Sequence, residues 1–291
     1  MTVKCIATDM DGTLLNGKLE VSQRNREAIF KAQQAGVEVM VATGRSYSEA
    51  RAALDEAGIE CPIICVNGAE TRDKKGEVID QAVLPKEKSH EIFEILRELD
   101  VYFEIYTNHG TYTNNYEMAL QIMVDIYLSA HTDIPAEQVR EAAKKRFTDG
   151  LVRLTDNYKE ILENPEHSVY KFLVFSFSQQ ELKEAEEKLK TIAGIAISSS
   201  GKENLEINHT EAQKGIALEK FVKQKNIQMK DVMAIGDNFN DLSMLERVGR
   251  PVAMGNAVPE VKAVCAFKTD GNDDDGVGKA IEQALLEQVK N

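Results

Sequence analysis

A short, largely apolar segment near the N-terminus ends in two carboxylates. Residues 3–8 are long enough for a buried strand, and the letters DMDGT follow, so that Asp9 and Asp11 stand two residues apart. In an open α/β sheet, ligands bind beyond the carboxyl ends of the strands. Paired acids at such an end hold a hard cation, transfer protons, or do both. An Asp-Gly pair also favours a turn, so this stretch alone leaves a purely structural role open.

The same strand pattern recurs over the next sixty residues. Apolar runs at 37–42 and 62–66 read as strands, and helical segments near 23–35 and 49–57 separate them, with Ser46 or Ser48 as the cap of the second helix. This alternation predicts right-handed βαβ units in a parallel sheet, with all strand ends on the side that carries Asp9. The polar residues at these ends are Thr43-Gly44-Arg45 and Asn67-Gly68.

The middle of the chain follows another pattern. A hairpin at 71–84 and an amphipathic helix at 85–99 lead into a block that is rich in hairpins and holds most of the aromatic residues. We expect residues 85–208 to form an α+β domain inserted into an α/β core made of residues 1–84 and 209–291. The fold class is therefore α/β, with a Rossmann-like parallel sheet, helices on both faces and an inserted domain.

The α/β pattern resumes with a helix that begins at Lys214. A strand at 231–235 follows and ends in GDNFND, which places Asp237 and Asp241 four residues apart, on one helix face. Acids at a helix N-terminus are common because they suit its dipole. This segment is denser in oxygen ligands than capping requires, and a third acid near Asp9 and Asp11 would complete a magnesium site. The next helix is expected to carry Leu242, Leu245 and Val248 on its apolar side.

These groups together suit phosphoryl transfer. A carboxylate such as Asp9 can attack phosphorus and form an aspartyl-phosphate, and Asp11 can protonate the leaving oxygen and then activate water. Magnesium would offset the repulsion between the carboxylate and an anionic phosphate. Thr43 and nearby backbone N–H groups before a helix can bind phosphate. A lone lysine is usually solvated, but Lys214 stands where it can hold nucleophile and phosphate together.

Composition narrows the classes of partner. The 291 residues carry a formal net charge of −13, which argues against nucleic acid and anionic membranes but not against a small anionic substrate beside a bound metal. No apolar run is long enough to span a membrane and no secretory signal is visible, so we expect a cytoplasmic protein whose four cysteines are reduced and buried. The chain has no P-loop, no dinucleotide-binding fingerprint and no serine-hydrolase elbow.

Four segments, taken in order, resemble the motifs of the haloacid dehalogenase (HAD) superfamily. They are Asp9-Met10-Asp11-Gly12-Thr13, the Ala-Thr-Gly-Arg form around Thr43, Lys214, and the segment from Gly236 to Asp241. The long insert, the Asn67-Gly68 pair and the late VAMGNA sequence are similar to the Cof-type branch, whose cap is a large α/β module. The resemblance covers essentially the whole chain.

This resemblance implies a role for each motif residue. Asp9 would be the nucleophile and a metal ligand. Asp11 would be the general acid/base and would bind magnesium through its backbone carbonyl, with Asp237 as the remaining protein ligand. Asp241, Arg45 and Asn67 would support the site; Arg45 meets a second phosphate or a sugar oxygen, or lies on the helix surface. Thr43, Gly44, Lys214 and Asn240 would bind the phosphate, and Met10 would bind it through its backbone.

The implied function is a magnesium-dependent phosphatase acting on small phosphorylated metabolites, such as sugar, flavin or pyridoxal phosphates. A sugar-phosphate phosphomutase and a non-catalytic regulator that binds phosphorylated metabolites are the alternatives. The inserted domain would set specificity by closing over the site. Residues near Asn208 and His209 would either reach the substrate or act as a hinge. The identity of the phosphoester and the oligomeric state are left open by the sequence.

Overall fold

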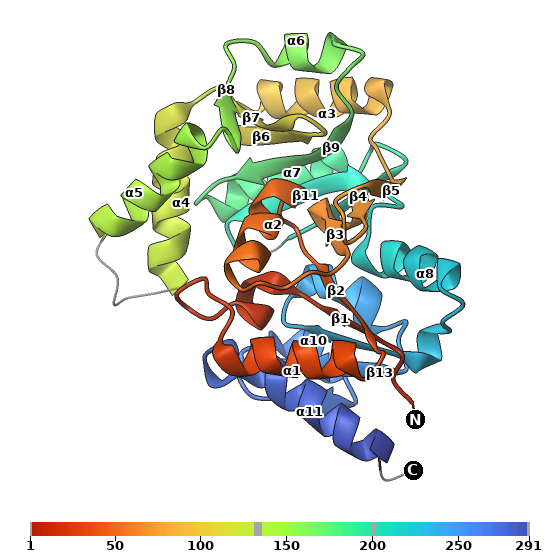
Figure 1. The fold of residues 1–291 in the computed structure, drawn as a ribbon. Helices are drawn as coiled ribbons and strands as arrows, with labels where there is room; N and C mark the ends of the chain where they lie inside the picture. Colours follow the sequence, from red (N-terminus) through yellow and green to blue (C-terminus); the bar gives the residue numbers. More distant parts are fainter. Residues whose placement is uncertain (1, 131–135, 200–201, 290–291) are drawn as a thin grey trace. The chain divides into compact units, whose positions relative to one another are not determined.

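The segments at the two ends of the chain form one sheet, as the alternating pattern predicts. In the computed structural model, which describes residues 2–130, 136–199 and 202–289, the chain divides into two compact units (Figure 1). The core unit is Met1–Ala82 with Glu211–Asn291, and the insert unit is Val83–Thr210. These boundaries fall two residues before and two residues after those expected from the sequence.

The core sheet has eight strands in the order β14-β13-β12-β1-β2-β3-β4-β5. The run from β14 to β3 is parallel, whereas β4 and β5 form the predicted hairpin and pair antiparallel. The strand β1 lies between β12 and β2, so the N-terminal carboxylates follow a central strand. The strands are β1 Cys5–Thr8, β2 Glu38–Ala42, β3 Ile63–Cys65, β4 Glu70–Arg72, β5 Val78–Gln81, β12 Val232–Gly236, β13 Arg250–Ala253 and β14 Phe267–Lys268.

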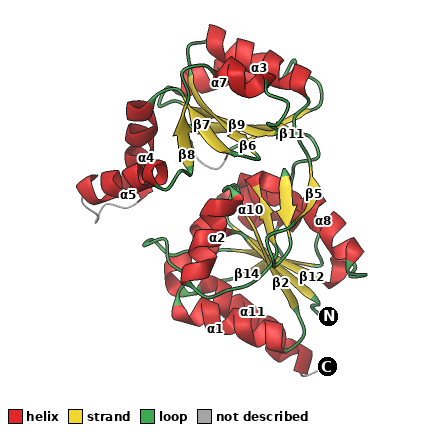
Figure 2. Ribbon diagram, turned by 45° about the horizontal axis from the view of Figure 1, so that its top comes forward, coloured by secondary structure: helices red, strands yellow, loops and turns green. Residues whose placement is uncertain are grey.

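Helices cover both faces of this sheet (Figure 2): α1 packs against α11, and α8 packs against α9. The helices are α1 Gln23–Gln34, α2 Tyr47–Glu56, α8 Lys214–Gln224, α9 Leu242–Leu245, α10 Pro259–Val264 and α11 Gly276–Val289. Ser46, rather than Ser48, caps α2 in a capping box with Glu49. The helix α9 is shorter than expected and ends before Val248, because the chain turns to enter β13 at Arg250. The predicted α/β class is confirmed.

The insert unit contains a six-stranded sheet in the order β10-β11-β9-β6-β7-β8, antiparallel except between β7 and β8. Its strands are β6 Tyr102–Thr107, β7 Gly110–Thr113, β8 Val152–Leu154, β9 Val169–Phe175, β10 Ile195–Ser198 and β11 Asn204–His209. Its helices are α3 Lys86–Glu98, α4 Tyr116–Ala130, α5 Ala136–Thr148, α6 Tyr158–Glu163 and α7 Gln179–Leu189. An apolar core joins one face of the sheet to α3, α6 and α7.

Side chains alternate between the two faces of this second sheet. Phe172 and Val174 of β9 belong to the apolar core, and Lys171, between Tyr170 and Phe172, points to the other face, where it contacts Glu206 of β11. The register places Lys171 opposite Tyr106 of β6. The insert sheet therefore has one apolar face and one face that carries charged residues.

Two expectations about the whole chain can be compared with the structure. All four cysteines are free and buried, as predicted. Within residues 2–130, 136–199 and 202–289, no helix has the length and hydropathy needed to cross a membrane.

Candidate active site

Polar residues follow the carboxyl ends of four neighbouring parallel strands. Asp9 follows β1, Asp237 follows β12, Thr43 follows β2, and Asn67 lies in the turn after β3. The N–H of Asp9 donates to the carbonyl of Ile235 at 2.9 Å, which extends the β1–β12 pairing up to the first carboxylate. Because these strands are parallel neighbours, their ends lie at one edge of the core sheet. The predicted clustering at this edge is therefore present in the structure.

Lys214 joins two of the acidic residues. Its Nζ atom lies 2.6 Å from Oδ1 of Asp9 and 2.7 Å from Oδ1 of Asp241, and the lysine is completely buried. The next residue must be small: a Cβ atom on Gly215 would lie 1.9 Å from the carbonyl oxygen of Ser243. The Lys-Gly pair thus lets the start of α8 approach the segment after β12 closely enough for both ion pairs to form.

The first turn after β1 depends on a second glycine. Gly12 has φ +70°, in the left-handed region, and a Cβ there would lie 2.6 Å from Oδ2 of Asp237. Next to it, the Thr13 hydroxyl donates to Oδ1 of Asp237 at 2.7 Å. The turn therefore both makes room for Asp237 and fixes its orientation. The sequence pattern contained Gly12 and Thr13, but nothing in their spacing assigned them to Asp237.

Asp241 acts on the backbone of its own segment. Its Oδ2 atom accepts the N–H groups of Asp237 and Asn238 at 2.9 and 3.1 Å, while its Oδ1 atom accepts Lys214. Both oxygens are thus engaged within the protein, and the residue is completely buried. This arrangement fits the supporting role expected of Asp241 better than direct participation in chemistry.

The acidic cluster fits a divalent cation. One carboxylate oxygen from each of Asp9, Asp237 and Asp241 lies within 4.8 Å of those of the other two. Among the described residues, no hydrogen-bond donor contacts Oδ2 of Asp9 or Oδ2 of Asp237, so these two oxygens are available as ligands. An all-oxygen donor set is the one that Mg²⁺ prefers.

Electrostatics also favour a cation there. Burial raises the pKa of Asp9 well above its usual value, repulsion from Asp241 adds to the rise, and Lys214 opposes it. Burial and repulsion from Asp241 likewise raise the pKa of Asp237 to about 7. For Lys214, burial lowers the pKa, but its two carboxylate partners outweigh burial and raise it above its usual value. A bound divalent cation would favour the ionised form of both aspartates.

The predicted phosphate-binding residues lie on the turns beside this cluster. Thr43 is completely buried, and its carbonyl accepts the N–H of Asn67 at 2.9 Å. Asn240 donates from Nδ2 to Oδ1 of Asn67 at 3.3 Å, and its own buried Oδ1 has no partner among the described residues. Met10 is buried in the turn after β1, and Gly44 follows Thr43 and is half-buried. Hydrogen bonds thus link the turns after β2 and β3 to the segment after β12.

Arg45 makes a contact that the sequence did not indicate. Its Nε atom lies 2.8 Å from Oδ2 of Asp11, and its Nη2 atom lies 2.5 Å from Oδ1. This two-point ion pair places Arg45 against the predicted acid/base residue, and the expected contact of Arg45 with a substrate oxygen stays a prediction. The two residues are 34 positions apart, so only the adjacency of β1 and β2 could have indicated the pairing.

Asn256 is another residue that sequence reasoning did not assign. Its Nδ2 atom donates to the carbonyl of Gly12 at 2.8 Å, and its Oδ1 atom accepts the N–H of Asn272 at 3.1 Å. Asn256 lies in the VAMGNA segment, whose sequence resembles the Cof-type branch but predicts no role for the individual residue. The contact braces the turn that carries both N-terminal carboxylates.

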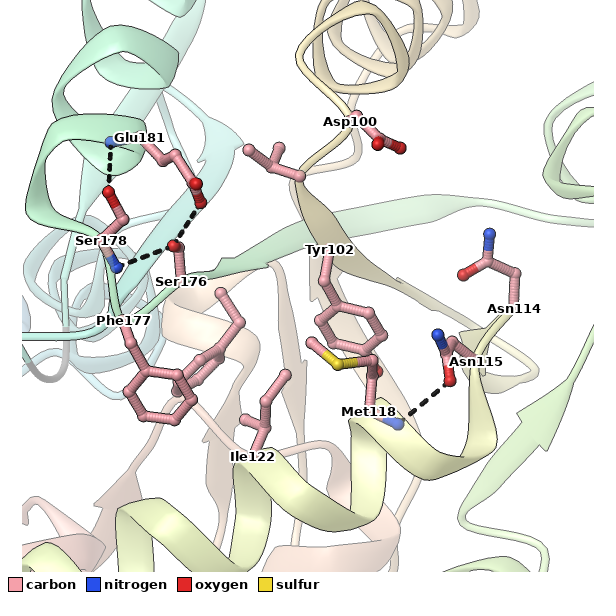
Figure 3. Close-up of a pocket in the computed structure, with 12 residues that line it drawn as sticks. Asp100, Tyr102, Asn114, Asn115, Met118, Ile122, Ser176, Phe177, Ser178 and Glu181 are labelled. Carbon is pink, nitrogen blue, oxygen red and sulfur yellow. Dashed lines mark hydrogen bonds between the residues drawn. The ribbon is translucent and has the colours of Figure 1, made fainter.

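A pocket of about 500 Å³ lies within the insert unit (Figure 3). Tyr102 of β6, Met118 and Ile122 of α4, and Phe177, which follows β9, line it. Three of the polar residues that line the pocket form hydrogen bonds at the start of α7. Ser176 donates to Glu181 at 2.6 Å, and Ser178 accepts the N–H of Glu181 at 3.3 Å. These polar groups are therefore engaged in helix capping.

The two residues expected near the substrate lie at the end of β11. Asn208 is buried and donates from Nδ2 to the carbonyl of Tyr170 at 3.0 Å, and His209 follows it at the end of the strand. Asn208 thus has a structural contact within the insert unit. A role of either residue toward a substrate stays a prediction.

Comparison with known proteins identifies relatives of the whole chain. Residues 6–281 match the family model for haloacid dehalogenase-like hydrolases. A 5-amino-6-(5-phospho-D-ribitylamino)uracil phosphatase of Bacillus subtilis, YwtE, is 37% identical over 98% of this chain and 99% of its own. The phosphatase YwpJ of the same organism is 32% identical over 97% of this chain and 100% of its own.

A solved structure agrees with these sequence matches. A haloacid dehalogenase-like hydrolase from B. subtilis superposes with a TM-score of 0.89, at 32% identity, over 96% of this chain and 99% of that one. The predicted resemblance to the HAD superfamily and its Cof-type branch is confirmed. The chain belongs to the haloacid dehalogenase-like hydrolase family.

Proposed function

We propose that this protein is a magnesium-dependent phosphatase that hydrolyses small phosphomonoesters through an aspartyl-phosphate on Asp9. The observation that carries the proposal is the buried ion pair at 2.6 Å between Lys214 and Asp9, with the carboxylate of Asp237 beside it. A carboxylate fixed in this way, with one oxygen free of donors, is arranged as a nucleophile rather than as a surface charge. The phosphatase names of the relatives support the same reaction class.

Asp9 would attack phosphorus with one oxygen of its carboxylate while Lys214 stays paired with the group. The lysine cancels part of the negative charge of the nucleophile and offers its positive charge to the phosphate oxygens. Thr43, Gly44 and Asn240 would bind those oxygens from the neighbouring turns, together with the backbone of Met10. The residues that would hold Mg²⁺ are Asp9, Asp237 and the backbone carbonyl of Asp11. When bound, the ion would reduce the repulsion between the attacking carboxylate and the phosphate dianion.

Asp11 would move the proton. As the bond between phosphorus and the ester oxygen breaks, Asp11 donates a proton to that oxygen and the alcohol leaves neutral. It then takes a proton from the water that attacks the aspartyl-phosphate, which releases inorganic phosphate and restores Asp9. Half of the Asp11 side chain is exposed, so it can reach an incoming group, unlike the buried Asp241.

We further propose that the insert unit selects the alcohol part of the ester. The charged face of its sheet, with Lys171, Glu206 and Tyr106, offers hydrogen-bonding and aromatic groups of the kind that recognise polar metabolites. The relative that acts on a ribitylaminouracil phosphate makes phosphorylated sugar alcohols and heterocycles the first esters to test. Nucleic acid and membranes are not expected as partners, and a cytoplasmic location stays a prediction.

A panel of phosphomonoesters assayed with and without Mg²⁺ tests this function. We expect release of inorganic phosphate, a preferred ester with the highest kcat/KM, and loss of activity on chelation. Asp9→Asn should abolish turnover and prevent trapping of a phosphorylated protein; retained activity would show that Asp9 is not the nucleophile. A sugar monophosphate that is rearranged without release of phosphate would instead identify a phosphomutase.

A further inference from the structure

Arg45 forms two hydrogen bonds to the carboxylate of Asp11, the proposed proton-transfer group. Nε and Nη2 of the guanidinium face the two oxygens of Asp11 at 2.8 and 2.5 Å. This parallel geometry matches the planar fork of arginine to the plane of a carboxylate, so that the pair fixes orientation as well as distance. A lysine at position 45 could not reproduce it, because its ammonium group is a point charge.

The backbone of Arg45 is itself anchored in the turn after β2. Its N–H donates to the hydroxyl of Thr43 at 3.1 Å, and its carbonyl accepts the N–H of Val66 at 2.9 Å. Its side chain is 24% exposed, whereas that of Asp11 is 50% exposed. The better anchored residue of the pair is therefore the arginine, and Asp11 is the residue that is held.

We propose that Arg45 is a positioning residue that holds the Asp11 carboxyl for proton transfer and ties it to the turn that carries Thr43. This inference rests on the proposed phosphatase reaction. An ionised carboxylate has about four lone-pair sites, so Asp11 can accept both Arg45 hydrogen bonds and still face a third group. When Asp11 carries the proton, one oxygen bears it and the other stays on the guanidinium. One turn would then place both a phosphate ligand and the acid.

The inference predicts a dependence on the leaving group. Departure of an alkyl alcohol requires a proton, whereas nitrophenolate leaves readily without one. Loss of Arg45 should therefore slow hydrolysis of an alkyl phosphate far more than that of p-nitrophenyl phosphate. The appropriate quantity is kcat/KM, because it covers the steps up to departure of the alcohol and excludes the later attack by water.

The experiment compares four variants with the wild type in the presence of Mg²⁺: Arg45→Met, Arg45→Lys, Asp11→Asn and the double variant Asp11→Asn with Arg45→Met. We expect Arg45→Met to lower kcat/KM on the alkyl ester about 100-fold, at the low end of general acid catalysis, with a much smaller loss on the nitrophenyl ester. Arg45→Lys should restore part of the loss. The double variant should be no slower than Asp11→Asn, because both changes remove the same function.

Two controls accompany these variants: inhibition by inorganic phosphate, and replacement of Arg51, another arginine that forms an ion pair with an aspartate. Arg51→Met removes an ion pair with Asp55 on the same helix, α2, and should leave both esters unaffected. An unchanged Ki for phosphate in Arg45→Met would show that the phosphate site is intact. Equal losses on both esters with a raised Ki would overturn the inference and make Arg45 a substrate contact, and additive losses in the double variant would also overturn it. An inactive wild type would refute the proposed function instead.

Discussion

Among the residues that the structure describes, two lysines are almost completely buried, one in each unit, and their surroundings differ. Lys214 in the core unit is 0% exposed and lies 2.6 and 2.7 Å from two carboxylates that come from separate segments. Lys171 in the insert unit is 2% exposed and lies 3.4 Å from Glu206 and 4.4 Å from the centre of the Tyr106 ring.

The two lysines differ in their place in the secondary structure and in the segments that supply their partners. Lys214 sits at the first position of a helix, and Gly215 allows the close approach that brings Asp9 and Asp241 to it. Lys171 sits inside β9, between strands on both sides, and its partners occupy those neighbouring strands. Burial is common to both lysines, so the catalytic role that we propose for Lys214 rests on its short contacts to acids at the strand ends.

Replacement of Lys214 should give the largest effect. Lys214→Met keeps the length of the side chain but leaves Asp9 and Asp241 without their cation. We expect kcat to fall by about 100- to 1,000-fold, as when one electrostatic group of an active site is removed, and the free energy of unfolding to fall by about 3–5 kcal/mol. Steady-state kinetics and urea unfolding in the presence of Mg²⁺ measure both quantities.

Lys220, on the same helix, provides the control. It pairs with Asp80 and Glu211 at the surface, where ion pairs contribute about 0–1 kcal/mol, so Lys220→Met should change neither quantity much. If Lys214→Met unfolded no more readily than Lys220→Met, the two buried ion pairs of Lys214 would not contribute to stability as argued.

The pH dependence of stability tests the acidic side of the core cluster. Burial and the charge of Asp241 raise the pKa of Asp237 from 3.8 to about 7. A group whose pKa is raised by folding contributes stability that is present below about pH 4 and is lost as pH rises through 7. The free energy of unfolding of the metal-free protein should therefore decline over this range, by up to about 1.4 kcal/mol per pH unit for each proton released.

Added Mg²⁺ should oppose this decline, because it binds the ionised carboxylates and stabilises the folded state by mass action. Asp237→Asn should reduce the slope without removing it, since the pKa of Asp9 is raised by the same causes. Urea unfolding between pH 4 and 8, with EDTA or with Mg²⁺, measures these slopes. A slope that is unchanged in Asp237→Asn would contradict the raised pKa.

The sequence predicted those features that follow from local patterns. Apolar runs that end in polar residues located the strand ends of Asp9, Thr43, Asn67 and Asp237, because parallel neighbours necessarily share an edge. The capping box of Ser46 with Glu49 shows that a helix start is also encoded within a few residues. Lys214 was singled out because it begins the helix where the α/β pattern resumes.

The features that were not predicted depend on contacts between distant segments. The two-residue strand β14 has too few residues for a periodic signal, and it pairs with β13 at the edge of the sheet. The Asp11–Arg45 pair requires the register of β1 and β2, and the placement of Thr13 against Asp237 spans 224 positions. Strand alternation places Lys171 on the face away from the apolar core, but only the packed structure shows that this lysine is buried.

Replacement of Lys171 should change stability and kcat less than replacement of Lys214 does, and it tests the comparison of the two buried lysines most directly. Lys171→Met removes the ammonium group that lies 3.4 Å from Glu206, and we expect a loss of about 1–3 kcal/mol of unfolding free energy, the range for a hydrogen bond to a charged group. Replacing both residues, Lys171→Met with Glu206→Leu, should recover part of the lost stability because no buried charge of this pair remains.

The activity of the same variants is the second measurement. The kcat for p-nitrophenyl phosphate should stay near that of the wild type in both variants, whereas the ranking of esters in the panel should change if the charged face selects substrates. Loss of nitrophenyl phosphate hydrolysis comparable to that of Lys214→Met would mean that both buried lysines serve phosphoryl transfer, and contact length would then not distinguish them.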